Sequence, residues 1–253
     1  MLVMTFNLRF ATPLDGPNEW QYRRDLVVDV IRRRAPDLLA TQEGTMPMLR
    51  FLEDRLTEYR ALTAHRQVDE TCQYPTIFYR AGRFQVIHSD EFWLSQTPEV
   101  HRSLSWGSAF PRLATYGLFQ EDGRAESFYC IDTHLDHISA EARLQGARMI
   151  RDYFVPLGRP LILAGDFNEP PESPVYRELI RDGGPWLDTW RSCHPPGEEA
   201  TTQHQFDGAP RGARIDWILA TPEFRVRRVA IVTDHQDNRY PSDHFPYETE
   251  VDY

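Results

Sequence analysis

The sequence predicts an α+β fold with strand-on-strand layers. Three observations lead to this prediction. Apolar, β-branched runs of strand length often occur in adjacent pairs, helical stretches are interspersed among them, and no linker or low-complexity tract divides the 253 residues. A strict alternation of strands and helices would instead indicate a parallel α/β sheet. We therefore expect one domain over residues 1–253.

The first part of the chain is expected to begin with a strand, a loop and a helix. Leu2–Leu8 is apolar enough for a buried strand, and the prolines and glycine of Ala11–Glu19 indicate a loop. Trp20–Arg34 carries one apolar stripe at helical spacing, with arginines opposite, and Pro36 ends the helix. The elements expected next are a strand over Asp37–Gln42, a helix over Met48–Leu56, and strands over Thr76–Arg80 and Phe84–Leu94 joined as a hairpin by Ala81–Arg83.

The second part is expected to contain another hairpin, two helices and several single strands. Ala114–Phe119 and Ser127–Thr133 flank a turn signal at Asp122-Gly123. Ser139 is a suitable N-cap for an amphipathic helix that continues to Phe154. The remaining expected elements are the strand Leu161–Ala164, the short helix Ser173–Arg181, and the strands Arg214–Ala220, Arg228–Val232 and Phe245–Val251.

The charged residues exclude several classes of enzyme. All 28 basic residues are arginine, so the chain has no lysine for the phosphates of a P-loop NTPase or a protein kinase, or for the imine of a pyridoxal enzyme or aldolase. The 38 acidic residues give a net charge of −10, which disfavours a large footprint on duplex nucleic acid. A local cluster of basic residues or a bound metal can still give one cleft a positive charge that attracts a small anion.

The expected location is the cytoplasm. The three cysteines form no CxxC motif, which favours free thiols in a reducing compartment. No apolar run approaches roughly 18 residues, so no membrane span is expected. The segment Met1–Phe10 lacks the pattern of a secretory signal. No heptad pattern indicates an oligomeric state.

Two candidate site residues follow the first two expected strands. Asn7 ends the first strand, where its amide must find hydrogen-bond partners, so it is either a structural residue or a ligand. Glu43 follows the second strand, and a carboxylate beside a buried strand needs a partner or a metal. Neither residue alone decides between these alternatives.

The segment from Asp132 to His137, Asp-Thr-His-Leu-Asp-His, allows two interpretations. Along a strand, Asp132, His134 and Asp136 alternate onto one face. The segment also resembles the HxHxDH signature of zinc hydrolases of the metallo-β-lactamase fold, with Asp132 in place of the first histidine. That interpretation predicts tightly bound zinc.

Three later segments also place polar side chains at strand ends. Asp166 and Asn168, in Gly-Asp-Phe-Asn, emerge on one side of a buried strand, the first as a base or metal ligand and the second as a donor to an oxyanion. Asp216 is a carboxylate on an apolar strand, and Asp243 precedes His244 in Pro-Ser-Asp-His-Phe-Pro. An imidazole that acts in catalysis needs an orienting acceptor, which these carboxylates can provide.

Taken in order, these motifs resemble those of the endonuclease/exonuclease/phosphatase superfamily, which includes DNase I, AP endonucleases, deadenylases, neutral sphingomyelinases and inositol phosphatases. The resemblance runs from Thr5 to Pro246, and its most specific parts are GDFN and SDHFP. A second set of residues is similar to small bacterial members, at least one of which is a sugar-phosphate phosphatase. This set consists of Phe6–Arg9, Asp15-Gly16, Trp20, Arg23-Arg24 and Arg239–Pro246.

The resemblance implies a DNase I-like, four-layer α/β sandwich, with two mixed sheets face to face, helices outside and the site at one edge. It implies that Glu43 is the main Mg²⁺ ligand, with Asn7 beside it and Asp243 nearby. Oxygen ligands suit Mg²⁺ or Mn²⁺ better than zinc. Some members carry an acid where this chain has Arg9, whose guanidinium is expected to contact phosphate instead.

The resemblance also implies the catalytic roles. Asp166 would orient or deprotonate the attacking water, and Asn168 would donate to a non-bridging phosphate oxygen. His134 would contact the phosphate or assist the leaving group. Asp216 would hold His244 in its tautomer and keep it charged, so that His244 binds the scissile phosphate.

The expected function is metal-dependent hydrolysis of a P–O bond by in-line attack of water, on a small phosphorylated metabolite such as a sugar phosphate. Arg112 is a further candidate for contact with the phosphate. The alternative is a nuclease or phosphodiesterase acting on single-stranded or short nucleic acid. A zinc hydrolase and a catalytically silent binding module are more remote alternatives. Substrate choice is expected to lie in four loops, Ala11–Glu19, Thr63–Tyr74, Thr97–Phe110 and Ser192–Pro210.

Overall fold

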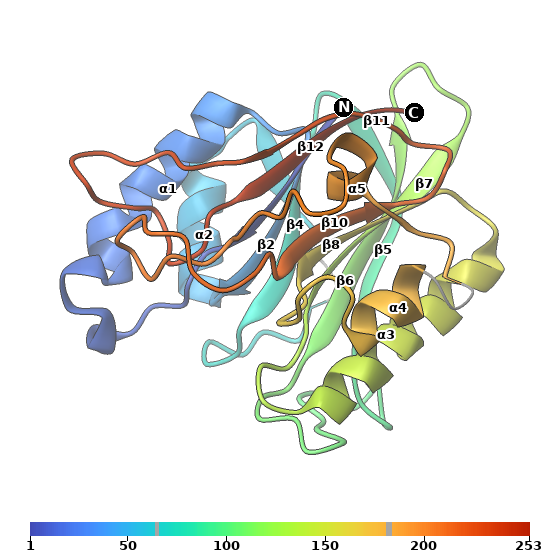
Figure 1. Cartoon of the computed structure of the whole chain (residues 1–253), viewed down its shortest axis with the longest axis horizontal. Helices are drawn as coiled ribbons and strands as arrows, with labels where there is room; N and C mark the ends of the chain where they lie inside the picture. Colours follow the sequence, from blue (N-terminus) through green and yellow to red (C-terminus); the bar gives the residue numbers. More distant parts are fainter. Residues whose placement is uncertain (64–65, 181–183) are drawn as a thin grey trace.

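Two six-stranded sheets, packed face to face, form the centre of the molecule (Figure 1). The computed structural model describes residues 1–63, 66–180 and 184–253. The first sheet consists of β1 (Leu2–Asn7), β2 (Leu38–Gly44), β3 (Tyr59–Ala61), β4 (Tyr74–Arg80), β11 (Arg225–Ile231) and β12 (Tyr247–Asp252). The second consists of β5 (Phe84–Trp93), β6 (Leu113–Glu121), β7 (Ser127–His134), β8 (Leu161–Asp166), β9 (Leu187–Asp188) and β10 (Asp216–Ala220).

Both sheets are mixed, as the sequence predicts. The strand orders are β11-β12-β1-β2-β4-β3 and β5-β6-β7-β8-β10-β9. The pairs β1–β2 and β7–β8 are parallel, and the neighbours β12 and β10 run antiparallel to β1 and β8.

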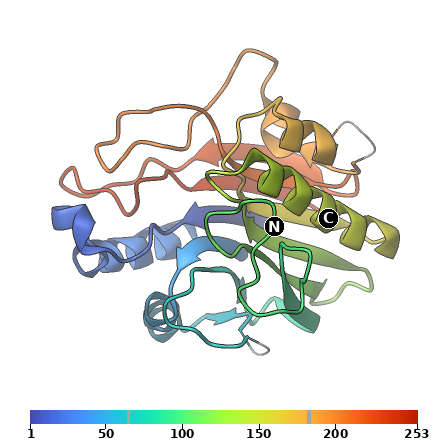
Figure 2. The same cartoon turned by 90° about the horizontal axis from the view of Figure 1, so that it is seen from below.

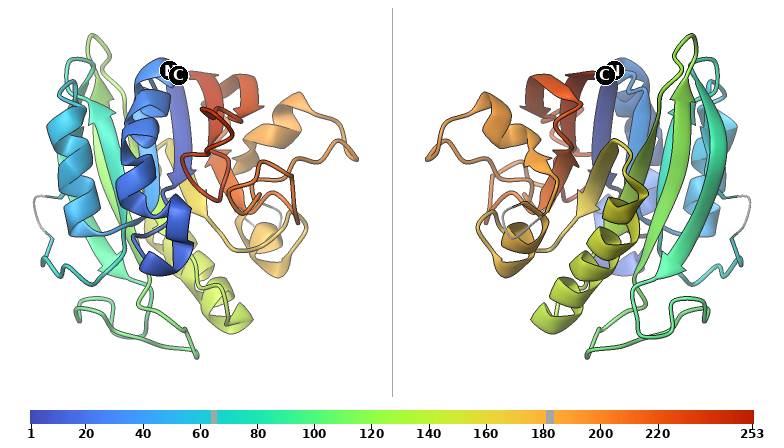
Figure 3. Two further views of the ribbon diagram at one scale, coloured as in Figure 1. Left: turned by 90° about the vertical axis from the view of Figure 1, so that its left-hand side faces the viewer. Right: turned by 90° about the vertical axis from the view of Figure 1, so that its right-hand side faces the viewer.

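The helices form two outer layers. The helices α1 (Trp20–Arg34) and α2 (Met46–Arg55) cover the first sheet, and α3 (Ala140–Phe154) and α4 (Pro174–Ile180) cover the second. Figure 3 shows these layers on opposite sides of the molecule. The predicted four-layer sandwich is therefore confirmed. No helix within the described residues combines the length and apolar character needed to cross a bilayer.

Three apolar clusters separate the four layers. One lies between the sheets and includes Val3, Phe119 and Ile162. The other two lie between each sheet and its helices, and the stripe predicted on α1 is buried against the first sheet. Burial of each such side chain contributes about 1.5–3 kcal/mol. Sequence signals also set the helix ends: Ala35 (φ 53°) caps the C-terminus of α1, and the Ser139 hydroxyl accepts a bond from Ala142 N at the start of α3.

Some sequence expectations differ from the structure. The predicted hairpin across Ala81–Arg83 is wrong, because β4 belongs to the first sheet and β5 to the second. The turn carries the chain from one sheet to the other instead. The short elements β3, β9 and α5 (Thr189–Cys193) were not expected, since two to five residues hold too little periodicity to identify them. Arg181, the last residue of one predicted helix, lies outside the described residues, as do residues 64–65 of a predicted loop.

The topology brings the predicted site residues to one edge. Parallel strands end at the same edge, which places Asn7 beside the end of β2 and pairs His134 with Asp166 across β7 and β8. Because β10 runs antiparallel to β8, its first residue, Asp216, pairs with Asp166 at this edge. The loop before β12 (red) reaches the same edge and lies against the loop before β10 (orange), with Gln203 bridged to His244 (Figure 2).

Two backbone features shape this edge. The register of β2 against β4 shifts between Thr41 and Gly44, and Glu43 within this bulge has a φ of 63°. Such bulges re-aim side chains beside functional sites. Gly165 has a φ of 149°, and a Cβ there would lie 2.0 Å from the Thr133 carbonyl oxygen. Only glycine therefore allows β7 and β8 to approach so closely beside Asp166.

Candidate active site

The predicted site residues surround one cleft of about 380 Å³. Its walls come from the strand ends and loops of both sheets. The residues that line it are Arg9, Phe10, Glu43, Gln73, Phe110, Arg112, His134, His137, Asp166, Asn168, Gln203, Asp243 and His244. Asn7 and Asp216 lie directly behind this lining, hydrogen bonded to Asp166 and His244 respectively. All the site residues expected from the sequence are thus brought together.

Asn7 links two carboxylates from different sheets. Its amide nitrogen donates to Glu43 Oε1 at 3.2 Å and to Asp166 Oδ2 at 2.9 Å. Its Oδ1 accepts from Arg9 N at 2.9 Å, which fixes the orientation of the amide. Glu43 is held further by Phe10 N, 2.9 Å from Oε2. Asn7 therefore positions both carboxylates at the floor of the cleft.

Asp166 is a buried carboxyl with an elevated pKa. Burial and the charge of Asp216 raise the pKa of Asp166 to about 7, although His244, Asn168 N and Asn7 stabilise its ionised form. Asn168 has a φ of 51°, and its backbone N–H donates to Asp166 Oδ1 at 2.9 Å. A carboxyl group of this kind is suited to accept a proton near neutral pH.

Asn168 and His134 form a second hydrogen-bonded unit. The Asn168 amide nitrogen donates to the Leu135 carbonyl and lies 3.0 Å from His134 Nε2. This makes Nε2 the acceptor and places the imidazole proton on Nδ1, which has no partner among the described residues. Burial lowers the pKa of His134 well below its usual value, so the ring is neutral.

His244 forms a buried ion pair with Asp216. Nδ1 of His244 lies 2.9 Å from Asp216 Oδ2. Burial alone would lower the pKa of His244, but the contact with Asp216 overcomes this effect and raises the pKa well above the usual value. His244 is therefore a cation that lines the cleft.

The two arginines predicted to contact phosphate differ in their surroundings. Arg9 donates to both oxygens of Asp15, from Nε at 3.0 Å and Nη2 at 2.9 Å, and its Nε lies 3.9 Å from Asp243. Arg112 is 7% exposed, and its Nε has no hydrogen-bond partner among the described residues. Arg112 is thus the more available of the two guanidinium groups.

The zinc site expected from the Asp132–His137 segment does not form. Asp132 lies between the sheets and accepts from Gln42 Nε2 at 2.7 Å, while Asp136 accepts from Ile138 N and Ser139 N after the strand has ended. Of the candidate zinc ligands in this segment, His134 and His137 line the cleft, but neither carboxylate does. The alternation argument fails because β7 ends at His134, before Asp136.

The residues that fit a metal are oxygen donors. Among the described residues, Asp166, Asp216 and His244 offer ligand atoms within 4.8 Å of one another, but protonated His244 is paired with Asp216 and cannot ligate. Glu43 and Asp243 line the cleft with carboxylates, and Arg9 is already paired with Asp15. This donor set fits a hard divalent cation such as Mg²⁺ or Mn²⁺.

Arg23 holds the loops around the site. Its guanidinium donates to four carbonyl oxygens, including those of Leu8, Arg9 and Pro241. Burial lowers the pKa of Arg23 to about 10. The Arg-Arg pair is visible in the sequence, but its partners are backbone atoms, which a sequence motif does not reveal.

Thr202 is a site residue that no sequence motif indicates. It is fully buried, and its hydroxyl accepts from Ile215 N at 3.1 Å and Asp216 N at 3.3 Å. Its carbonyl accepts from Phe245 N at 2.7 Å. Thr202 therefore holds the backbone on both sides of the Asp216–His244 pair.

Substitution of Thr202 tests this positioning role. Thr202→Val is expected to lower kcat/KM about tenfold, because two buried N–H groups lose their acceptor. Thr202→Ser keeps the hydroxyl and should stay within about twofold of the wild type. The measurement is kcat and KM over a pH series for both variants. Equal losses in the two variants would assign the effect to packing rather than to the hydroxyl.

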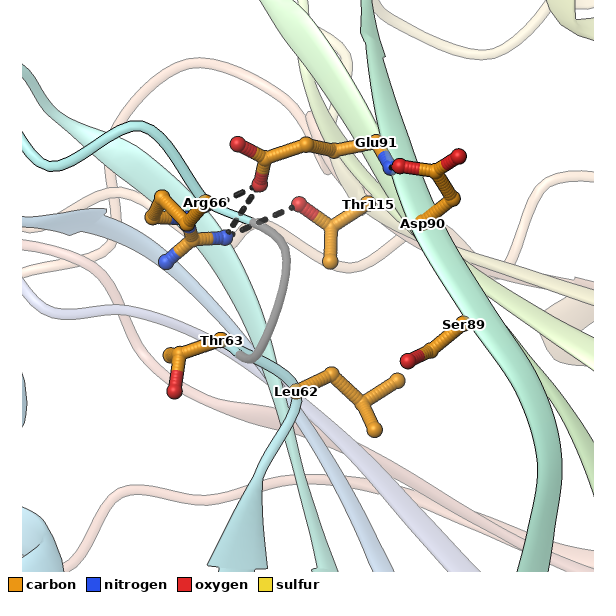
Figure 4. Close-up of a pocket in the computed structure, with 7 residues that line it drawn as sticks. All are labelled: Leu62, Thr63, Arg66, Ser89, Asp90, Glu91 and Thr115. Atoms are coloured by element: carbon orange, nitrogen blue, oxygen red, sulfur yellow. Dashed lines mark hydrogen bonds and ion pairs between the residues drawn. The ribbon is translucent and has the colours of Figure 1, made fainter.

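A second, very small cavity lies away from this cleft. Figure 4 shows it beside Arg66, whose guanidinium contacts Glu91 at 2.8 Å and Thr115 Oγ1 at 3.2 Å. Arg66 also donates to Thr76 Oγ1 and the Pro75 carbonyl. The volume of this small cavity is about 10 Å³, which admits roughly one water molecule. With its arginine satisfied, this cavity is structural.

Comparison with known proteins agrees with this geometry. The profile described as Endonuclease/Exonuclease/phosphatase family matches residues 4–244. The chain belongs to the endonuclease/exonuclease/phosphatase family. It is accordingly a hydrolase of phosphoesters, which confirms the resemblance seen in the sequence.

Two solved structures and one further protein illustrate the similarity of this chain to known proteins. A mannosyl-6-phosphatase of Bacteroides thetaiotaomicron VPI-5482, Bt3783, is 28% identical, with a TM-score of 0.90 and full coverage of both chains. A protein of unknown function from Enterococcus faecalis V583 is 31% identical, with a TM-score of 0.88 over 100% of this chain and 99% of that one. Uncharacterized protein L388 of Acanthamoeba polyphaga mimivirus is 26% identical over 66% of this chain and 67% of that protein.

More distant solved structures share the fold. Danio rerio TDP2, solved with a single-strand DNA product, is 17% identical, with a TM-score of 0.76 over 100% of this chain and 99% of that one. Proteins with this fold thus include one named for a sugar phosphate and one solved with a single-strand DNA product. The fold alone does not choose between these substrates.

Proposed function

We propose that the protein hydrolyses phosphomonoesters of small metabolites, such as a sugar phosphate, with Mg²⁺ or Mn²⁺ and by in-line attack of water. The observation that carries the proposal is the arrangement in one cleft of a buried base, Asp166, a charged imidazole, His244, and the carboxylates of Glu43 and Asp243. The volume of about 380 Å³ is in the range of small-molecule sites.

Asp166 is the proposed residue that orients or deprotonates the water. Its oxygens are fixed by Asn168 N and Asn7, so the carboxyl is already positioned. A pKa of about 7 makes it a better proton acceptor than an ordinary carboxylate while it can still ionise.

The proposed phosphate contacts come from four parts of the chain: the loops before β6 and β12, the end of β7 and the loop after β8. His244 and Arg112 supply positive charge, and the Arg112 Nε makes no hydrogen bond with the described residues, while Asp136 Oδ2 lies 3.9 Å from it. The Asn168 amide nitrogen donates to a non-bridging phosphate oxygen, and this bond replaces its contact with His134 Nε2. The neutral His134 ring then contacts the phosphate or assists the leaving group. Arg9 is the weaker candidate, since Asp15 already occupies its guanidinium.

The proposed metal ligands are Glu43 and Asp243. When bound, the divalent cation neutralises negative charge that develops on the phosphate and the leaving oxygen. Asn7 turns its amide nitrogen toward Glu43, so its proposed part in this site is to orient that ligand. Loss of such an orienting partner typically lowers metal affinity or activity about 10–100-fold.

Glu43→Gln is expected to weaken metal binding. Loss of the anionic ligand should raise the Mg²⁺ concentration for half-maximal activity at least about tenfold. It should also shrink the rise in melting temperature that Mg²⁺ produces in the wild type. Melting in EDTA should change by only a few degrees. An unaltered metal titration would show that Glu43 is not a ligand.

The charge of the chain and of its cleft favours a small substrate. The net charge is −10, and the cations that line the cleft are Arg9, Arg112 and His244. A nucleic-acid strand needs a longer basic track for its phosphates. The 28% identity to a mannosyl-6-phosphatase over the full length supports the same choice.

A paired assay tests the proposal. One arm measures phosphate release from sugar phosphates and nucleotides, and the other measures cleavage of a bis-aryl phosphate and of labelled single-stranded and duplex oligonucleotides. Each arm includes Mg²⁺, Mn²⁺, Zn²⁺ or EDTA, with Asp166→Asn as the inactive control. Monoester turnover that EDTA abolishes is the expected result. Oligonucleotide cleavage with little phosphate release would contradict the proposal.

A further inference from the structure

One wall of the cleft is an aromatic surface. Phe110, in the loop between β5 and β6, is 50% exposed, and its ring stacks on His137, with centroids 5.6 Å apart and planes at 29°. The Arg112 guanidinium lies 5.8 Å from the centre of the Phe110 ring. Phe110 and His137 both line the cavity that contains Asp166 and His244. This pair, the Phe110–His137 platform, is therefore presented to whatever the cleft binds.

Asp136 fixes the platform in place. Its Oδ2 accepts from Ala109 N at 2.9 Å, beside Phe110, and its Oδ1 accepts from Ile138 N and Ser139 N, beside His137. Burial opposes ionisation of Asp136, but these backbone N–H groups outweigh it and lower the pKa of the carboxyl. The two loops are thus tied together through one charged group. An exposed aromatic pair that is already ordered loses little entropy when a ligand packs on it.

The cleft also contains two unused amides. Gln73 and Gln203 line it, and neither side chain makes a hydrogen bond or ion pair with another described residue. A carboxamide both donates and accepts, so each of the two can pair with a hydroxyl group, which also does both. Phe110 and Gln73 also border an adjoining cavity of about 100 Å³, so the cleft continues past the platform.

We propose that the Phe110–His137 platform and the amides of Gln73 and Gln203 form the subsite for the leaving group, and that this group is a neutral, cyclic polyol. The apolar face of the ring packs on Phe110, and its hydroxyl groups bond to the two amides. The scissile phosphate then occupies the cationic end of the cleft at His244 and Arg112. This inference rests on the proposed function and adds the shape and chemistry of the alcohol that is released.

Phe110→Ala tests the platform with two substrates, a hexose 6-phosphate and glycerol phosphate, whose alcohol has no ring. The kcat/KM for the hexose phosphate is expected to fall about tenfold, mainly through KM, which is the scale of one aromatic contact. This loss should exceed the loss for glycerol phosphate at least fivefold. Phe110→Tyr should restore the preference. Gln73→Met, which keeps the length of the side chain, should also raise KM for the hexose phosphate more than for glycerol phosphate.

Ile138→Ala is the matched control, since Ile138 is 66% exposed beside His137 but does not line the cleft. It should leave both substrates unaffected. Equal losses of Phe110→Ala on the two substrates, or no loss, would overturn the subsite while leaving the proposed function intact. A wild-type protein that hydrolyses neither monoester but cleaves oligonucleotides would overturn the proposed function and this inference with it.

Discussion

Asp166→Asn is expected to lower kcat by about three orders of magnitude, within the range found for loss of a general base. The amide cannot take a proton from water, although it can still accept from Asn168 N. The measurement is kcat on the best monoester at saturating Mg²⁺ and pH 8. Turnover within tenfold of the wild type would remove Asp166 from the proposed mechanism.

The same variant should not lose stability. A carboxyl whose folded pKa is raised to about 7 from 3.8 binds its proton more tightly when folded, so folding is favoured below pH 3.8 and this contribution is lost as the pH rises through 7. At pH 8 in EDTA, the neutral asparagine should therefore melt at or above the wild-type temperature.

Asp132→Asn is the matched control for Asp166→Asn. It replaces another buried carboxyl of the second sheet, one whose Oδ1 bonds to Gln42 between the sheets and not to the cleft. Burial also raises the pKa of Asp132 well above its usual value. Asp132→Asn should keep kcat within about twofold, which would show that the loss in Asp166→Asn is local to the site.

Asp216→Asn is expected to lower kcat/KM about a hundredfold at pH 8 and to make the loss depend on pH. Without the Asp216 charge, burial dominates and the pKa of His244 falls, so the ring is neutral at pH 8 and the phosphate loses a cation. Lower pH protonates the ring again. The ratio of variant to wild-type kcat/KM should thus rise as the pH falls from 8 to 6. Loss of the Asp216 charge also lowers the pKa of Asp166, so Asp166 stays ionised to a lower pH in the variant than in the wild type, which moves the ratio in the same direction.

Asp188→Asn is the control that separates the pH-dependent loss of kcat/KM from a general loss of stability caused by breaking a buried ion pair. Asp188 also pairs with a buried cation, Arg214, at 2.5 Å, but it does not line the cleft. Its loss should lower the melting temperature without changing the shape of the pH profile. A flat ratio for Asp216→Asn would indicate that Asp216 only supports the fold.

The sequence predicted the site residues better than the connections between strands. Asn7, Glu43, Asp166 and His244 could be selected as candidates because each is a polar residue near the end of an apolar strand, and because their motifs follow the order seen in a known family. The hairpin at Ala81–Arg83 was misassigned because turn residues show that a strand ends but not which sheet the next strand joins.

Other site features could not be predicted, since they depend on contacts between distant segments. Thr202 lies in a polar loop and acts through backbone N–H groups of the start of β10. Asp136 continues the alternation of β7 in sequence but leaves the strand and ties two loops. Arg112 occurs in a loop, where only the structure shows that it is buried.

The clamp formed by Arg23 has a consequence for how the protein folds. Its guanidinium joins the carbonyl of Leu8 to that of Pro241, a partner 218 residues from Arg23 along the chain. At the other end of β1, Met1 N bonds to Val251 O, and β12 pairs with β1 in the middle of the first sheet (Figure 1). Contacts of such long sequence separation form slowly, because a large loop must close first. During refolding, hydrolytic activity should therefore return last, after helical structure has formed, and can report the completion of the first sheet.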